Sequence, residues 1–237
     1  MAATHRPNVI ITIDGPAGTG KSTVAYLLAK RLGLEFLDTG AMYRAAALIA
    51  IEHGVDPRDG AALADAVQQA HLHFDWKSDP PRLLVGDRDV SFRIRDMDVS
   101  GIVSIVAAQG PLRRVLVQQQ RRIAQQHPRL VSEGRDQGSV VFPDASVRFY
   151  LHADVRIRAD RRVAQLVAAG KNVDEARIVR DIEERDRLDA SRADGPLVRP
   201  HGAIDIDTSN RNVTQVVDVM EAAARELLPH AGFSPKD

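Results

Sequence analysis

A glycine-rich segment near the N-terminus constrains this chain more than any other feature of its sequence. An apolar run over 9–14 precedes the segment, and residues 23–29 behind it have the apolar spacing of a helix. A loop of this composition between a strand and a helix is typical of nucleotide phosphate-binding sites. The loop and the first residues of the helix are Gly15, Pro16, Ala17, Gly18, Thr19, Gly20, Lys21, Ser22 and Thr23.

The residue types of this loop suit the binding of a nucleoside triphosphate. Its glycines allow the backbone to curl until several N–H groups point at one anion. The Lys21 ammonium can reach the terminal phosphates, which makes it a candidate catalytic residue, and the Ser22 hydroxyl can bind the magnesium ion that accompanies the nucleotide. Mg²⁺ brought in with ATP is the metal cofactor that we expect.

Composition narrows the class of protein further. The chain has 237 residues, of which 44% are hydrophobic, so it can bury the core of one domain. Lysine plus arginine and aspartate plus glutamate both number 32, and a balanced charge argues against nucleic-acid or membrane partners. There is no cysteine. We expect a soluble, cytoplasmic, monomeric protein that acts on small molecules.

Strand and helix patterns alternate along most of the chain. Strands are expected at 9–14, 34–37, around 131, at 146–151 and at 203–206, and helices at 41–52, 61–70, 97–108, 112–126, 155–169, 174–187 and 213–227. This alternation predicts an α/β fold with a parallel sheet covered by helices on both faces. Two short strands, 72–76 and 82–85, with turn residues between them, predict a small antiparallel insert. Ligands of such a sheet bind beyond the carboxyl ends of its strands.

A stretch rich in arginine, 171–199, follows the fifth of these helices. Most of its charges are expected to form solvated pairs on a helix surface. Arg185 and Arg192 are different, because their separation of seven residues would place them on one face if the helix continued. The guanidinium group is suited to forked contacts with phosphate, so an arm that carries both residues could close over a triphosphate.

The arginines also bear on the phosphoryl acceptor. A phosphate monoester has a second pKa near ~6 and needs no general base at neutral pH. Its obstacle is repulsion between two anions, about 4 kcal/mol for unit charges 4 Å apart at an effective dielectric constant of ~20. Fixed cations reduce this repulsion, and the candidates are Arg44, Arg113, Arg135, Arg185 and Arg192. A neutral hydroxyl acceptor would instead require a base such as Asp38 or Asp136, and this alternative stays open.

Four motifs in the same order resemble the bacterial cytidylate kinases, nucleoside monophosphate kinases of the P-loop class. They are 13–22, 37–44, 134–145 and the spacing of Arg185, Asp186, Asp189, Arg192, Pro196 and Leu197, and the likeness extends from about 9 to 227. The resemblance implies transfer of the γ-phosphate of ATP to CMP or dCMP. It also implies one kinase domain over 1–237, with a core at about 8–53, 129–170 and 202–228, an acceptor-binding lobe with the β insert at about 54–128, and a helical lid at about 171–199.

The resemblance also implies roles for single residues. Thr39 and Arg44 correspond to positions that bind the acceptor nucleotide, and Ser104 and Arg113 to contacts with the cytosine and the acceptor phosphate. Arg135 corresponds to a phosphate contact and Asp136 to a contact with the base, since a carboxylate can accept from the cytosine amine but not from the uracil oxygen. Lid and sugar contacts correspond to Arg185, Asp189 and Arg192. With Lys21, the residues Arg135, Arg185 and Arg192 form the expected catalytic set.

The roles of two aspartates and the exact function have alternative interpretations. Asp38 could cap the next helix instead of serving the acceptor, and Asp14 could contact the magnesium shell or end its strand. Gln137, Ser139, Leu188 and Ala190 depart from the residues that the family more often has. The competing functions are a kinase of the same fold that prefers UMP or phosphorylates a hydroxyl group, and a nucleotide-gated switch.

Overall fold

The computed structural model describes residues 7–168, 170 and 172–236, and a five-stranded sheet forms its centre. The strand order is β2-β6-β1-β7-β8, and every neighbouring pair is parallel. The strands are β1 (Val9–Asp14), β2 (Glu35–Asp38), β6 (Arg129–Gly134), β7 (Val147–His152) and β8 (Ile204–Asp207). The parallel α/β class expected from the alternating pattern is confirmed.

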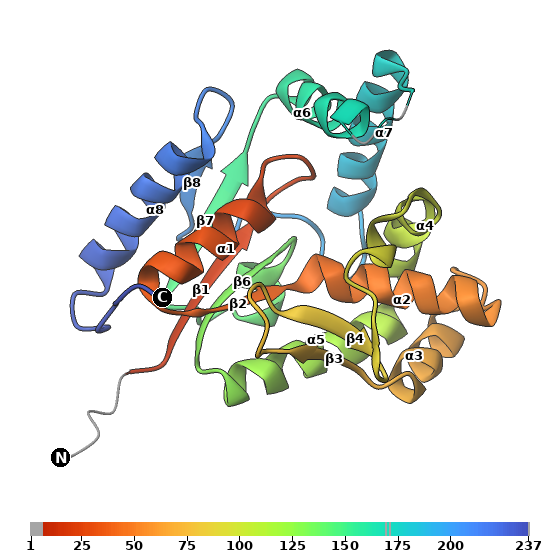
Figure 1. The fold of residues 1–237 in the computed structure, drawn as a ribbon, viewed down its shortest axis with the longest axis horizontal. Coiled ribbons are helices and arrows are strands. Elements are labelled where there is room, and N and C mark those ends of the chain that lie inside the picture. The colour runs from red at the N-terminus through yellow and green to blue at the C-terminus, as the bar shows by residue number, and fades with distance from the viewer. Residues whose placement is uncertain (1–6, 169, 171, 237) are drawn as a thin grey trace.

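Helices cover both faces of the sheet and form a separate hydrophobic cluster on each (Figure 1). On one face α1 (Lys21–Leu32) and α8 (Val213–Leu227) pack against Ile11 and Ile13, which are fully buried. On the other face lie α2 (Thr39–His53) and α5 (Gly110–Gln126), and Ile10 packs there. Because successive side chains of a strand point to opposite faces, the consecutive apolar residues of β1 pack on both sides of the sheet.

A second group of elements lies beside α2 and α5. It consists of α3 (Gly60–Gln69), β3 (Leu72–Asp75), β4 (Arg82–Val85), β5 (Arg88–Asp89), the 3₁₀ turn η1 (Arg93–Arg95) and α4 (Met97–Ala107). Strands β3, β4 and β5 form an antiparallel sheet of their own. This confirms the small insert, to which the structure adds the third strand, too short to be expected from an alternating pattern.

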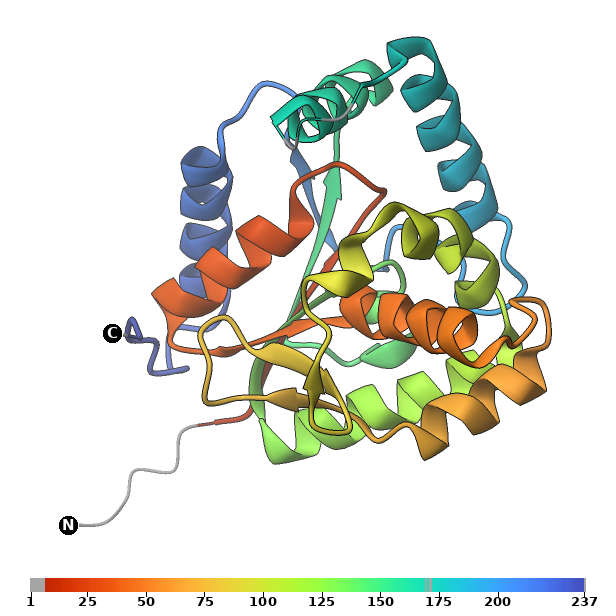
Figure 2. The same ribbon diagram turned by 45° about the vertical axis from the view of Figure 1, so that its right-hand side comes forward.

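Two helices stand beyond the carboxyl ends of the central strands, at the top of Figure 1: α6 (Val155–Ala168) and α7 (Glu175–Ala190). They pack on each other, and the C-terminal part of α7 approaches α4, as Figure 2 shows. The expected end of the helix at 169 and the expected start of the lid at 171 lie outside the described residues. Together with α2 and α4, these two helices therefore enclose the carboxyl ends of the central strands, where the predicted binding motifs lie.

The structure differs from the sequence-based expectations at three places. Helix α7 ends at Ala190 and does not continue to 192, so the condition under which Arg185 and Arg192 would share one helix face is not met, and Arg192 follows in a loop. Helix α5 begins at Gly110 and not at the expected 112, because the proline at 111 is well tolerated at a helix start. A short helical turn, η2 (Gln137–Val141), follows Asp136 where only a loop was expected.

Within the described residues, no helix is both long and apolar enough to cross a membrane. The division into core, acceptor-binding lobe and lid, with the boundaries given above, stays a prediction.

Candidate active site

The glycine-rich loop joins β1 to α1 and has the backbone that glycine permits. Gly15, Gly18 and Gly20 have φ values of 149°, 81° and 87°, a range that other residues rarely adopt. A Cβ at Gly15 would lie 2.0 Å from the backbone oxygen of Leu151 on β7. The loop therefore packs against the sheet closely enough to exclude any side chain there, as a rigid phosphate cradle requires.

Lys21 is buried at the base of this loop. Its ammonium group donates a hydrogen bond of 2.7 Å to the backbone oxygen of Pro16. Burial lowers the pKa of Lys21 to about 7, and the nearby positive charge of Arg135 acts in the same direction. A phosphate anion placed here would favour the charged ammonium, so the environment of Lys21 is suited to an anionic ligand.

One carboxyl group contacts Ser22 and a second lies beside the first, and neither was expected to serve the metal. The Ser22 hydroxyl donates to Glu133 Oε1 at 2.6 Å, and Glu133 ends β6, 111 residues away. Asp38 lies at the end of the adjacent strand β2, where its register partner is Glu133. Burial and the charge of Glu133 raise the pKa of Asp38 to about 7. The two carboxyl groups and the hydroxyl form an oxygen-rich cluster beside the phosphate loop.

Asp38 also caps helix α2, which is one of the two roles that the sequence left open. Its side chain accepts a hydrogen bond of 2.8 Å from the backbone N–H of Ala41. Arg95 of η1 lies 3.6 Å from its other oxygen. The next residue, Thr39, is buried and donates to the backbone oxygen of Glu133 at 2.7 Å. Thr39 therefore joins α2 to the carboxyl end of β6.

A buried ion pair lies on the side of the sheet covered by α5. Arg113 donates to Asp136 Oδ2, and both side chains are about 4% exposed or less. The Arg113 guanidinium also lies over the ring of Tyr43, 5.5 Å from its centroid. Burial raises the pKa of Asp136 although Arg113 acts against that rise. This structure thus brings together Arg113 and Asp136, which the sequence predicted separately for the acceptor phosphate and the base.

Asp189 connects two more of the predicted arginines. Its buried carboxylate accepts from Arg135 Nε at 2.8 Å and from Arg192. Although burial opposes it, the charges of Arg135 and Arg192 hold the pKa of Asp189 below its usual value. The loop after α7 thereby attaches to the segment after β6, and it brings Arg192 to the site although α7 ends before it.

Arg185 projects from α7 into the same region. Among the described residues it has no ion-pair partner within 4 Å, and its Nε has no hydrogen-bond acceptor. Burial lowers the pKa of Arg185 to about 9, and Arg135 adds to the effect. Arg44 donates to Ser100 of α4 at 3.0 Å. Ser104 is half-buried one turn further along α4, and its role in binding the acceptor stays a prediction.

Arg158 of α6 is a further residue that the sequence analysis did not single out. It is 6% exposed and donates to the backbone oxygen of Ala17 in the phosphate loop at 3.1 Å. Its Nη2 lies 2.7 Å from Asp186 of α7. One guanidinium group therefore connects the phosphate loop with the helix that carries Arg185. A charged helix such as α6 gave no signal of this, because both contacts are distant in sequence.

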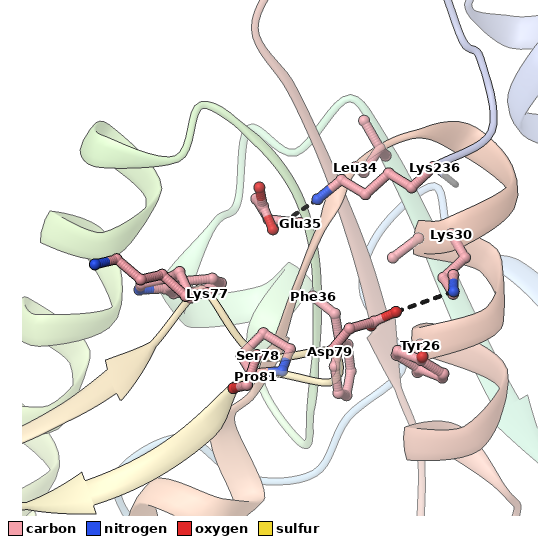
Figure 3. Close-up of a pocket in the computed structure, with 12 residues that line it drawn as sticks. Tyr26, Lys30, Leu34, Glu35, Phe36, Lys77, Ser78, Asp79, Pro81 and Lys236 are labelled. Atoms are coloured by element: carbon pink, nitrogen blue, oxygen red, sulfur yellow. Dashed lines mark hydrogen bonds and ion pairs between the residues drawn. The ribbon is translucent and has the colours of Figure 1, made fainter.

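A separate cavity of about 180 Å³ lies near the C-terminal end of α1, away from the phosphate loop (Figure 3). Four of its charged side chains form two ion pairs: Lys30 lies 3.0 Å from Asp79, and Lys236 lies 2.8 Å from Glu35. Tyr26, Phe36 and Trp76 supply its aromatic surface. None of the residues predicted for nucleotide binding lines this cavity.

Comparison with known proteins identifies the family of this chain. The family model described as cytidylate kinase matches residues 11–226. A cytidylate kinase of Rhodococcus jostii is 44% identical over 211 residues, which cover 88% of this chain and 91% of that protein. One of Citrifermentans bemidjiense is 38% identical over 228 residues, covering 96% and 97%.

The structural comparison concerns the fold alone. A solved structure of an uncharacterized protein from Eubacterium ventriosum aligns with a TM-score of 0.50 at 13% identity, covering 92% of this chain and 99% of that one. The matched range, 11–226, includes the glycine-rich loop, the Arg113–Asp136 ion pair and the arginines around Asp189. On the strength of that match and of relatives about 40% identical over nearly the whole chain, this protein belongs to the cytidylate kinase family.

Proposed function

We propose that this protein transfers the γ-phosphoryl group of ATP to CMP or dCMP and forms ADP and the corresponding cytidine diphosphate. The observation that carries the proposal is the convergence of buried cations beyond the carboxyl ends of the central strands. The charges of Arg135 and Arg185 help to lower the pKa of Lys21. Those of Arg44 and Arg192 help to lower the pKa of Arg185. Family membership supplies the nucleotide. Two anionic substrates that must meet would require such a concentration of positive charge.

The chemical step needs no base from the protein. An oxygen of the acceptor phosphate, ionised at neutral pH, attacks the γ-phosphorus, and the bond from that phosphorus to the β,γ-bridging oxygen breaks, so ADP leaves with the electron pair. The loop amides of 15–23 and Lys21 bind the donor phosphates. Arg135, Arg185 and Arg192 stabilise the charge on the transferred group and keep the two anions together.

Recognition of the base is assigned to the Arg113–Asp136 pair with its neighbours. A carboxylate accepts a hydrogen bond from the exocyclic amine of cytosine, whereas uracil presents an oxygen there. Thr39, Arg44, Ser104, Arg113, Asp189 and Arg192 complete the proposed acceptor site. Asp136 would thus penalise UMP, which makes a UMP-preferring kinase less consistent with this site.

The residues around Ser22 fit a magnesium ion. Mg²⁺ prefers oxygen ligands and normally takes one or two from protein and the rest from phosphates and water. Ser22 supplies a hydroxyl and Glu133 a carboxylate 2.6 Å from it, whereas the described residues contain no group of three or more acidic, histidine or cysteine side chains arranged around a metal. When bound, the ion neutralises charge on the donor phosphates. Ser22 is the proposed ligand, and Glu133 and Asp38 orient it and the surrounding water.

Glu133→Gln should raise the Mg²⁺ concentration needed for half-maximal activity about 10- to 100-fold, because partners that orient a metal ligand typically contribute that much. The measurement is the CMP kinase rate titrated with Mg²⁺ at a fixed ATP concentration. Glu35→Gln is the matched control, since Glu35 lies on β2 and pairs with Lys236 outside the site. An unchanged Mg²⁺ dependence in Glu133→Gln would remove the cluster from the metal site.

A panel of acceptors tests the proposed activity itself. ATP turnover is measured with CMP, dCMP, UMP, AMP and shikimate, and we expect CMP and dCMP to be the preferred acceptors. A preference for shikimate would favour the hydroxyl-phosphorylating alternative, and hydrolysis that no acceptor stimulates would favour the nucleotide-gated switch.

Asp136→Asn should reduce the preference for CMP over UMP, as a ratio of kcat/KM values, about 10- to 100-fold, the effect of one well-placed base contact. Asp144→Asn is the control, because Asp144 is exposed eight residues further along the chain. If Asp136→Asn keeps the wild-type selectivity, other residues read the base.

The remaining features of the proposal concern organisation. We propose that the chain acts as a monomer in the cytoplasm on small-molecule substrates, without nucleic-acid or membrane partners. We also propose that 54–128 forms the acceptor-binding lobe and 171–199 the lid around the core segments 8–53, 129–170 and 202–228. Size-exclusion chromatography with light scattering tests the first of these statements.

A further inference from the structure

The turn that carries Asp136 is capped from an unexpected place. Asp136 occupies the position before the first residue of η2, yet its side chain makes no capping hydrogen bond. The backbone N–H groups of Gln137 and Gly138 donate instead to Asp14, one to each carboxylate oxygen and both at 2.7 Å. Asp14 belongs to β1, more than 120 residues away in sequence.

Asp14 is fixed in position by the sheet. It is the last residue of β1 and is fully buried, with Gly134 of β6 and Tyr150 of β7 as its register partners. Burial raises the pKa of Asp14 to about 7, opposed by the two amides; the charged and titratable groups that face it are Asp136, Lys21 and Tyr150. A buried carboxylate is costly unless it is hydrogen-bonded, and here both oxygens accept from backbone amides.

The turn itself fits closely against β1. A Cβ at Gly138 would lie 2.8 Å from Thr12 Oγ1 and 3.0 Å from Pro200 Cγ, so the residue that donates to Asp14 Oδ2 has no room for a side chain. The opposite side of the turn is held by the buried Gln137 side chain, which accepts from Ser132 at 2.8 Å. The direction in which Asp136 leaves the turn is therefore set by its attachment to β1 and β6.

An aspartate in the position of Asp136 ordinarily uses its own side chain to cap the turn that follows. We propose that Asp14 is a positioning residue that caps η2 in place of Asp136 and so keeps the Asp136 carboxylate directed at Arg113 and the acceptor base. This inference rests on the proposed function. Without Asp14, the Asp136 carboxylate would turn back to the free amide of Gly138, the N–H two residues on that an N-cap side chain reaches, and withdraw from Arg113.

The test is Asp14→Asn, which keeps the size of the side chain but offers an NH₂ group to one of the two amides. We expect kcat/KM for CMP to fall about 10- to 100-fold, the cost of a small misplacement of a binding group, while KM for ATP stays near its wild-type value. The preference for CMP over UMP should fall as well. Asp59→Asn is the matched control, because Asp59 caps α3 through two backbone N–H groups and does not contact the proposed site.

A double-mutant cycle separates positioning from general loss of stability. In an Asp136→Ala background, Asp14→Asn should leave the CMP/UMP ratio unchanged, because the group it positions is gone. Thermal melts accompany each variant, and if Asp14→Asn is not folded, the cycle is repeated with Asp14→Glu, which moves the carboxylate by one methylene.

The outcomes are distinct. A selectivity loss in Asp14→Asn that disappears in the Asp136→Ala background supports the inference. Wild-type selectivity in the folded variant, or an equal loss in both backgrounds, overturns it. Failure of the wild-type protein to phosphorylate CMP would instead overturn the proposed function, and the wild-type arm of the same experiment reports it.

Discussion

Lys21→Ala is expected to lower kcat for CMP phosphorylation about 10²- to 10³-fold, the usual cost of removing one preorganised donor from a transition state. The ammonium group is held at the base of the phosphate loop by Pro16 and is buried in surroundings that lower the pKa of Lys21 to about 7. Because it is costly to keep a cation there without an anion, removal of the charge should leave the fold intact. Steady-state kinetics and a thermal melt measure the two effects.

Lys30→Ala is the control for this variant. Lys30 lies on the same helix, nine residues further along, and pairs with Asp79 at the distant cavity. Its replacement should not alter kcat. Near-normal turnover in Lys21→Ala would contradict the phosphate-binding role of the loop, and a loss of cooperative melting would show that the activity loss reports folding.

Arg185→Ala is expected to lower kcat about 10³-fold, in the range found for arginines that stabilise a transferring phosphoryl group. Arg113, Arg135 and Arg192 each contact a carboxylate in this structure, whereas Arg185 has no such partner among the described residues. Its guanidinium is consequently free to bind phosphate oxygens. Arg185→Lys should recover only part of the loss, because an ammonium group lacks the forked geometry.

Arg187→Ala gives the comparison for Arg185, since Arg187 is on the same helix but is exposed and pairs with Glu184 at 2.6 Å. Its kcat should equal that of the wild type. Equal losses in the two variants would indicate that α7 acts only through its overall charge, and the assignment of Arg185 to the transferred phosphate would then be withdrawn.

Local patterns predicted the strand, glycine-rich loop and helix at the start of the chain well. The phosphate loop could be predicted because strand, loop and helix adjoin in sequence, and the parallel sheet because its strands are separated by helices. Arg135 and Asp136 were found through a motif that places them directly after β6. In these cases the chemistry and the local structure reside in the same short segment.

What the sequence analysis missed depends on contacts between distant segments. The pairing of Ser22 with Glu133 and the contacts of Arg158 with Ala17 and Asp186 become visible only when the strands and α6 are placed. Helix α7 extends to Ala190, three residues beyond the expected end at 187, because helix ends are the part of a pattern that the sequence defines least well. Strand β5 has two residues, fewer than a pattern of alternation can reveal.

The pairing of β1 with β6 has a consequence for how substrates of different size could be accommodated. The last residues of the two strands, Asp14 and Gly134, are register partners. Strand β1 precedes the glycine-rich loop, and β6 precedes the turn η2. The two chain segments therefore depart from points about 4.8 Å apart, a spacing dictated by backbone hydrogen bonding. Divergence in acceptor size must then occur in the peripheral helices and the β insert, because the sheet cannot widen there without losing its ladder.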